Sequence, residues 1–169
     1  MLGSIYTIGH GNITAEEFFD NLKRYNIDAI VDIRSKPYSN YVPHFNKEYL
    51  KALCNKNNMI YFYLGNLLGG RPDDPSVYKT ETKVDYNILA RKPFFALGLD
   101  RLSQIIETYN ACLVCSEEQP DNCHRNLLVA PALESIGVKV NHILPDGSIT
   151  NSENLLLKNK CSVFVFPST

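Results

Sequence analysis

The chain has 169 residues, of which 44% are hydrophobic and 21% are charged, and its formal net charge is −1. This length and balance fit one globular domain with a sizeable core and exclude a disordered chain. The small net charge gives no global attraction to nucleic acid or to a membrane surface, and no apolar run has the length of a membrane span.

The sequence predicts a cytoplasmic protein with reduced cysteines. Its N-terminus runs directly into a strand-like segment, with no charged leader and no cleavage-site pattern. Five cysteines are present, an odd number at irregular spacing, which argues against a disulfide framework. These cysteines are Cys54, Cys112, Cys115, Cys123 and Cys161.

The N-terminal part alternates strand-like and helix-like segments. Buried strands are predicted over residues 5–8, 29–33 and 59–64, because these runs are apolar and rich in β-branched and aromatic residues. Thr14 is the expected N-cap of a first helix, and Glu17 completes a capping box. A second helix is predicted over 46–57, whereas 65–72 is too rich in glycine for regular structure.

The C-terminal part continues this alternation after a long polar interruption. Residues 71–93 show no period and predict a long loop or lid, which is more often functional than idle. A helix near 99–109, a strand over 111–115, a helix after Cys123 and a strand over 138–144 follow. Pro131 is expected to bend that helix or shift its start. Residues 145–169 form a C-terminal extension, in which 161–166 predict a late edge strand.

Strands alternating with helices indicate a single α/β domain over 1–169, with three layers and a mainly parallel, Rossmann-like sheet. Ligands of such sheets bind beyond the carboxyl ends of the strands. The unusual polar and glycine residues of this chain follow those predicted ends, so we expect one composite pocket there. These residues are His10, Arg34, Ser35, Gly69, Gly70, Arg71, Cys115 and Glu117.

The predicted pocket has the features of an anion site. Cys123, His124 and Arg125 open a predicted helix, and helix N-termini attract anions. Arg34 and Arg125 are suited to bidentate phosphate binding, or each pairs with a buried acid such as Asp32 or Glu117. His124, Ser35, Gly69, Gly70 and Arg71 complete the predicted anion-binding set. The glycine loop lacks the ending of a P-loop, so hydrolysis of a nucleoside triphosphate is not indicated.

Four residues are candidates for catalysis. Cys123 is expected near a helix N-terminus, which favours a thiolate with a pKa below about 8.5, although a small half-buried turn residue is the alternative. Cys115 is a second candidate thiol. His10 and Glu117 are the candidate proton carriers, or else serve a structural hydrogen bond and an arginine. His142, within an apolar strand, is expected in the core.

A zinc site is the competing interpretation of the cysteines. Cys112 and Cys115 have ligand spacing, and Cys123 and His124 would complete a set. Two arguments oppose it: Cys112 and Cys115 face opposite sides of a strand, and the adjacent Cys123 and His124 are poorly placed to converge. We therefore expect no metal ion, and no motif indicates a cofactor.

Three blocks of sequence resemble one known family. The first is Thr7-Ile8-Gly9-His10; the second is Asp32-Ile33-Arg34 with Pro37, Ser39, Leu64-Gly65 and Gly69-Gly70; the third is Cys115-Ser116-Glu117 with Cys123-His124-Arg125 and His142-Ile143. In order and spacing they resemble the family named domain of unknown function 488. The resemblance implies a single α/β domain with a polar pocket lined by these motifs. The chain departs from it at Gly11, where a serine is expected.

Three functions are compatible with the sequence. The first is an enzyme acting on a phosphorylated or nucleotide-like substrate. The second is a non-catalytic module that binds a nucleic acid end or a phosphorylated ligand, with tyrosines stacking on bases. The third is a thiol redox switch formed by Cys115 and Cys123.

Overall fold

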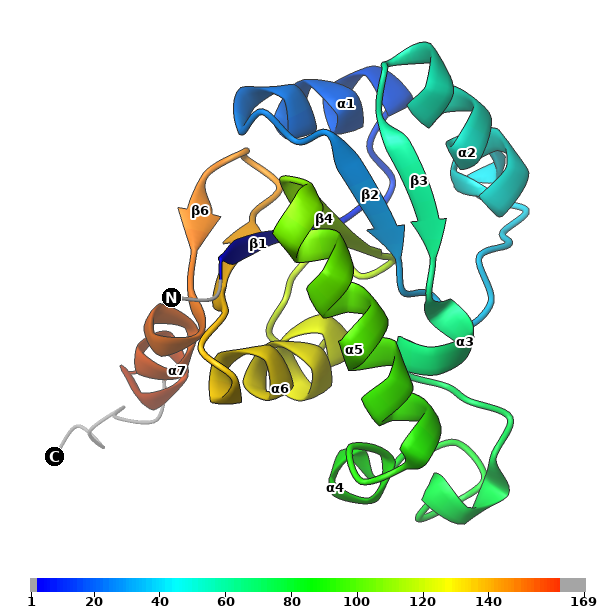
Figure 1. The fold of residues 1–169 in the computed structure, drawn as a ribbon, viewed down its shortest axis with the longest axis vertical. Coiled ribbons are helices and arrows are strands. Elements are labelled where there is room, and N and C mark those ends of the chain that lie inside the picture. Colours follow the sequence, from blue (N-terminus) through cyan, green and yellow to red (C-terminus); the bar gives the residue numbers. More distant parts are fainter. Residues whose placement is uncertain (1–2, 162–169) are drawn as a thin grey trace, which may run out of the picture.

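A computed structural model describes residues 3–161 of the chain. A six-stranded sheet runs through its centre in the order β3-β2-β4-β1-β5-β6 (Figure 1). All neighbouring strands pair in parallel except β5 and β6, which pair antiparallel. The strands are β1 (Ser4–Gly9), β2 (Ala29–Asp32), β3 (Ile60–Tyr63), β4 (Ala111–Cys115), β5 (Lys139–Ile143) and β6 (Ile149–Thr150).

Helices cover both faces of this sheet and give the domain three layers. They are α1 (Ala15–Arg24), α2 (Lys47–Lys56), α3 (Gly65–Leu68), α4 (Tyr86–Leu89), α5 (Pro93–Thr108), α6 (Ala130–Ser135) and α7 (Ser152–Cys161). Two 3-10 turns, η1 (Pro43–Phe45) and η2 (Pro75–Val77), and one π-helical turn, η3 (Arg125–Val129), complete the structure. This architecture confirms the predicted Rossmann-like α/β fold.

The two faces of the sheet have separate cores. On one face α1 and α2 bury residues such as Phe18 and Leu50 against the sheet. On the other face α3, α5 and α6 pack through residues such as Leu68, Leu102 and Leu133. The central strands β2 and β4 are buried along their whole length, as expected for parallel strands covered on both sides.

The order of the strands predicts a crevice between the carboxyl ends of β1 and β4. The chain leaves β1 toward α1 on one face, and it leaves the adjacent β4 toward α6 on the other face. Neighbouring strands whose connections go to opposite faces leave a crevice between their carboxyl ends. His10 follows β1 at this point and Cys115 ends β4, so the predicted ligand edge coincides with the crevice.

One prediction of secondary structure was wrong, and a second falls almost entirely outside the described residues. The segment 65–72 contains the helical turn α3, because Gly65 serves close packing: a Cβ at this position would lie 1.9 Å from the carbonyl oxygen of Arg34. The predicted edge strand over 161–166 begins on Cys161, which is the last residue of α7, and residues 162–166 lie outside the described residues. Helix α5 also starts at Pro93, earlier than predicted, because proline is favoured in the first helical turn.

The first helix is capped as the sequence predicted. The Thr14 hydroxyl accepts the backbone N–H of Glu17 at 3.2 Å, and the Glu17 carboxylate accepts the backbone N–H of Thr14 at 2.9 Å. These bonds satisfy two donors that the helix itself leaves unpaired. They fix the start of the helix that follows His10.

Replacing Thr14 with alanine should therefore lower the free energy of unfolding by about 1 kcal/mol, because the hydroxyl acceptor is lost. Urea denaturation of Thr14→Ala beside Thr14→Ser measures this effect, since serine keeps the hydroxyl. Equal midpoints for the two variants would show that the cap contributes nothing.

Candidate functional site

Three strand ends meet at the centre of the candidate site. The backbone N–H groups of His10 and Gly11 donate to the carbonyl oxygens of Cys115 and Ser116, each at 3.0 Å. The N–H of Ile33 donates to the carbonyl of Val114 at 3.2 Å. The segments after β1 and β2 are thereby fixed on either side of the end of β4. The convergence predicted from the strand pattern is present.

A buried ion pair at the end of β2 orients Arg34. The Arg34 Nε and Nη2 atoms donate to the two carboxylate oxygens of Asp32 at 2.8 and 2.7 Å. The Tyr61 hydroxyl donates to the same carboxylate at 2.6 Å. Asp32 is fully buried and Arg34 is 6% exposed, so the pair is shielded from solvent. This bidentate contact is the alternative in which Arg34 pairs with a buried acid, and it leaves the Nη1 atom of Arg34 to His10.

His10 contacts Arg34 as a neutral ring. Its Nδ1 atom lies 2.8 Å from the carbonyl oxygen of Gly11, to which only a protonated nitrogen can donate. Its Nε2 atom then accepts from Arg34 Nη1 at 3.2 Å. Burial, with a contribution from the charge of Arg34, lowers the pKa of His10 to about 4. Near neutral pH this ring supports Arg34 rather than carrying a positive charge.

Four side chains after β4 form what we call the thiol cluster: Cys115, Glu117, Cys123 and His124. Their ligand atoms all lie within 4.8 Å of one another. The two sulfur atoms are 3.1 Å apart, and the Glu117 Oε2 atom lies 2.7 Å from Cys115 Sγ and 3.4 Å from Cys123 Sγ. The His124 Nδ1 atom lies 3.4 Å from Cys115 Sγ and 3.9 Å from Cys123 Sγ.

The structure brings the side chains of Cys123 and His124 to one point, contrary to what their adjacency in the sequence predicts. Cys123 and His124 were expected to diverge because they are adjacent, yet both side chains reach Cys115. Cys123 precedes the helical residues, and the chain continues from His124 into the π-helical turn η3, so regular helical geometry does not separate them. The argument about Cys112 holds: this residue packs in the core beneath α1 and α2, on the opposite face of β4 from Cys115.

Contacts within the thiol cluster shift the pKa values of Cys115, Glu117 and His124. The hydrogen bond with Cys123 and burial raise the pKa of Cys115 well above its ordinary value. Burial alone would raise the pKa of Glu117 and lower that of His124, but contacts within the cluster outweigh it. The pKa of Glu117 is therefore lowered and the pKa of His124 is raised. The Glu117 carboxylate accepts from the Cys115 thiol, and the Cys123 sulfur lies within reach of both Cys115 Sγ and Glu117 Oε2.

Glycines let the surrounding loops approach the cluster. A Cβ on Gly9 would lie 1.6 Å from the carbonyl oxygen of Glu117, and a Cβ on Gly70 would lie 2.8 Å from the ring of His124. A Cβ on Gly69 would lie 2.1 Å from the Ser35 hydroxyl, which accepts the backbone N–H of Arg71 at 2.9 Å. Gly69 and Gly70 thus allow close packing of the site, a role their sequence did not distinguish from ligand contact.

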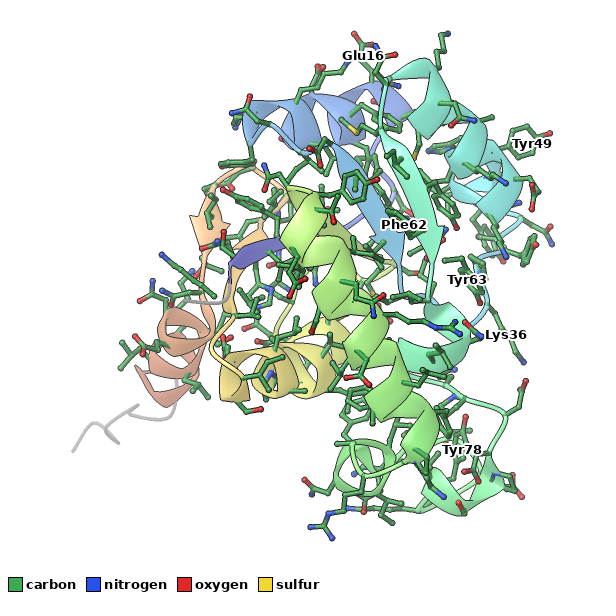
Figure 2. The ribbon with its side chains drawn as sticks, in the orientation of Figure 1. Glu16, Lys36, Tyr49, Phe62, Tyr63 and Tyr78 are labelled. Atoms are coloured by element: carbon green, nitrogen blue, oxygen red, sulfur yellow. The ribbon has the colours of Figure 1, made fainter. Side chains whose placement is uncertain are left out.

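A cavity of about 550 Å³, the site cavity, opens beside the cluster. Its wall contains Cys115, Glu117 and His124 together with the cations Arg34, Lys36 and Arg71. Residues of the 71–93 segment close another part of the wall; these are Asp73, Tyr78, Glu81, Thr82 and Tyr86. Figure 2 shows Lys36 beside α3 and Tyr78 in the segment leading to α4. The sequence had pointed to Tyr78 and Tyr86 among the tyrosines able to stack on bases, but not to Lys36.

Two neighbouring hollows share part of this wall. One of about 500 Å³ contains Ser35, Lys36 and Arg71 but no member of the thiol cluster. Another of about 370 Å³ contains His10 and Arg34. His10 therefore reaches a cavity, as predicted, but on the far side of Arg34 from the cluster. Cys123 is 1% exposed and lies behind Cys115, so Cys115 is the sulfur that faces the site cavity.

Arg125 does not lie where an anion-binding residue is needed. Its side chain is fully buried and is not part of the site-cavity wall. Its Nη2 atom donates to the carbonyl oxygen of Glu118 at 2.9 Å, and its Nε and Nη1 atoms have no hydrogen-bond partner among the described residues. The sequence placed Arg125 correctly at the helix start but could not show that its side chain turns into the core.

His142 shares this buried region with Arg125, as its predicted core position implied. It is fully buried, and its Nδ1 atom lies 2.8 Å from the Thr7 hydroxyl. Burial, with a smaller effect of the charge of Arg125, lowers the pKa of His142 from 6.5 to about 4. The neutral ring is therefore the form compatible with the folded state.

The lowered pKa makes stability depend on pH between 6.5 and about 4. In that window the unfolded chain binds a proton at His142 and the folded protein does not, so acid favours unfolding. The free energy of unfolding should fall with pH by up to about 3 kcal/mol from this residue alone. Urea denaturation of the wild type and of His142→Gln at several pH values isolates the contribution, and identical pH dependence in both would refute it.

The fold and site together define an α/β protein of Rossmann-like architecture whose ligand edge carries two thiols, an imidazole and a carboxylate beside three cations. The model of the family described as domain of unknown function DUF488 matches residues 14–131. The chain belongs to this family. The matched range includes Arg34, Cys115, Glu117, Cys123 and His124, whereas His10 precedes it.

No curated protein matches the chain. Within residues 3–161, none of the helices combines the length and the apolar character that crossing a membrane requires.

Proposed function

We propose that this protein is an enzyme that binds a phosphorylated, nucleotide-like ligand in the site cavity and acts on it at the thiol cluster. The observation that carries the proposal is that one cavity wall holds both Arg34, Lys36 and Arg71 and the reactive groups of Cys115, Glu117 and His124. Cations bind an anionic group, and the neighbouring thiol, carboxylate and imidazole are the usual carriers of nucleophilic and proton-transfer chemistry.

The cations differ in how they would contribute. Arg34 is held by Asp32 and His10, so its orientation is set before a ligand arrives. Lys36 and Arg71 are exposed and form no salt bridge within residues 3–161, so they are free to turn toward a phosphate. A preorganised guanidinium beside mobile cations supports binding of an anion with more than one charged oxygen.

The aromatic part of the wall supports a nucleotide-like ligand. Tyr78 and Tyr86 both line the site cavity and both belong to the 71–93 segment. The Tyr78 hydroxyl donates to the carbonyl oxygen of Pro72 at 2.8 Å, which fixes its ring within that segment. Bases stack on aromatic rings of this kind without sequence preference. The segment contributes one wall of the site cavity.

Binding is tested with inorganic phosphate and a nucleoside 5′-monophosphate in isothermal titration calorimetry. Arg71→Gln and Lys36→Gln should each weaken binding about tenfold, because each removes one charge-assisted hydrogen bond. Arg91→Gln is the matched control, since Arg91 is exposed and does not line the site cavity. Absence of binding in the wild type, or equal affinity for Arg71→Gln and Arg91→Gln, would overturn the proposal.

Turnover separates an enzyme from a binding module. Release of inorganic phosphate from the bound mononucleotide is followed for the wild type and for Glu117→Gln, which keeps the shape of the side chain. We expect release by the wild type, a loss of more than tenfold in the variant, and phosphate binding by the variant that is no weaker, because the substitution removes a negative charge from the cavity wall. Binding without release would instead identify a non-catalytic module for a phosphorylated ligand or a nucleic acid end.

A thiol redox switch is the second candidate, and the separation of the two sulfurs favours it. The Sγ atoms of Cys115 and Cys123 are 3.1 Å apart, and a disulfide needs a separation of about 2.05 Å. Hydrogen peroxide would take two electrons and two protons from the thiols, forming one S–S bond and two water molecules.

Mild peroxide treatment should therefore lower the intact mass by two hydrogen atoms, with peptide mapping joining Cys115 to Cys123. Cys123→Ala should not show this loss, whereas Cys112→Ala should, because Cys112 lies on the other face of β4. A disulfide joining any other pair, or no mass loss, would exclude the switch.

A further inference from the structure

The geometry points to a zinc site formed by Cys115, Cys123, His124 and Glu117. These four side chains offer two sulfurs, one imidazole nitrogen and one carboxylate oxygen within 4.8 Å of one another. Zinc accepts all three kinds of donor and takes four of them in a tetrahedron. Magnesium and calcium bind oxygen ligands almost alone, so the paired sulfurs exclude them as the preferred ions.

The distances are close to those that a tetrahedral ion imposes. Zinc bonds of about 2.0–2.3 Å separate neighbouring ligand atoms by roughly 3.3–3.8 Å. The contacts from His124 Nδ1 to the two sulfurs, at 3.4 and 3.9 Å, already fall near this range. The contact between the sulfurs is 3.1 Å and that from Cys115 to Glu117 is 2.7 Å, so each must lengthen by less than about 1 Å.

The imidazole is oriented for metal binding by a backbone group. The Nε2 atom of His124 lies 3.1 Å from the carbonyl oxygen of Ile33, which can only accept a hydrogen bond. Nε2 therefore carries the proton, and the lone pair of Nδ1 points to the sulfurs. Ligating histidines usually have their second ring nitrogen fixed in this way. The ring fits here because Gly70 has no Cβ.

Burial distinguishes Glu117 from the other three ligands. Cys115, Cys123 and His124 are buried, whereas Glu117 is exposed and follows the end of β4. Three fixed ligands and one exchangeable position are typical of catalytic zinc sites. Cys115, Glu117 and His124 also face the site cavity, so the fourth position opens toward Arg34 and Lys36.

The role of the zinc ion in binding a substrate phosphate rests on the function proposed above, but the zinc site itself does not. Exchange of Glu117 for a phosphate oxygen would place the anion between zinc and the cations of the cavity wall, where both attract it. Binding of the ion requires the two thiols to lose their protons, so metal uptake releases protons to solvent. This release is independent of any ligand in the cavity.

Cobalt is the probe for the metal site. The reduced, chelator-treated protein is titrated with Co²⁺, whose bonds to thiolates absorb in the near ultraviolet and whose tetrahedral complexes absorb strongly in the visible range. We expect saturation at one ion per chain, release of protons, and displacement of cobalt by one equivalent of Zn²⁺. Glu117→Gln should keep the thiolate absorption, because both sulfurs remain.

Cysteine variants provide the matched comparison. Cys115→Ala and Cys123→Ala should each weaken zinc binding by at least about a hundredfold, since each removes a thiolate ligand. Cys112→Ala should bind as the wild type does, because its sulfur lies on the other face of β4. Circular dichroism confirms that each variant is folded. No thiolate-to-cobalt absorption in the wild type, or equal affinity in Cys112→Ala and Cys123→Ala, would overturn the zinc site.

The same preparations distinguish failure of the site from failure of the proposed function. Inorganic phosphate is titrated into zinc-free and zinc-loaded protein. Zinc binding without phosphate binding would leave the metal site standing and refute the anion-binding function. Phosphate binding without zinc binding would refute the metal site alone. Tighter phosphate binding to the zinc-loaded protein is the outcome expected if the ion and the cations act on one ligand.

Discussion

The candidate site depends on the buried ion pair between Asp32 and Arg34. Taking both charges out of water is costly, and it is tolerated because the guanidinium meets both carboxylate oxygens and Tyr61 donates to one of them. Arg34 then reaches across the sheet edge to His10, which follows β1. One carboxylate thus fixes the position of a cation that lies in the walls of two cavities. Loss of Asp32 would leave a buried positive charge without its partner, and the edge would lose its fixed point.

The residue between this pair completes the arrangement. Ile33 packs its side chain in the core beneath α5, while its carbonyl oxygen accepts from His124. Asp32 therefore orients the guanidinium of Arg34. The next residue, Ile33, orients the imidazole of His124 through its carbonyl oxygen while its side chain packs in the core. The thiol cluster is held from the other side by β4, whose last residue is Cys115. Arg34 and Cys115 thus stand at strand ends, whereas Glu117, Cys123 and His124 lie in the segment that follows β4.

Strand periodicity was sufficient to predict where the site lies but not how its side chains point. Parallel strands bring their carboxyl ends to one edge whatever the side chains do, so His10, Arg34 and Cys115 were placed together correctly. The segment 116–124 has no repeating geometry, and nothing in its pattern shows that Cys123 turns behind Cys115 or that His124 joins them. Arg125 opens the π-helical turn, and its place at a helix start gave no sign that its side chain is fully buried. Lys36 was missed because an exposed lysine after a strand is ordinary until a cavity is seen beside it.

The candidate functions differ in whether the sulfurs of Cys115 and Cys123 carry protons, a free negative charge or a metal ion. Without a cation, the Cys115 thiol donates to the carboxylate of Glu117, and the hydrogen bond with Cys123 together with burial disfavours the Cys115 thiolate. A free thiolate on Cys115 would be a negative charge at a position that is almost fully buried, which is costly. A divalent cation between the sulfurs removes this cost, because it replaces two protons by one ion of equal charge. The same geometry that disfavours a free thiolate therefore favours a metal-bound one, and it leaves Glu117 as the ligand that can exchange with an anion in the cavity.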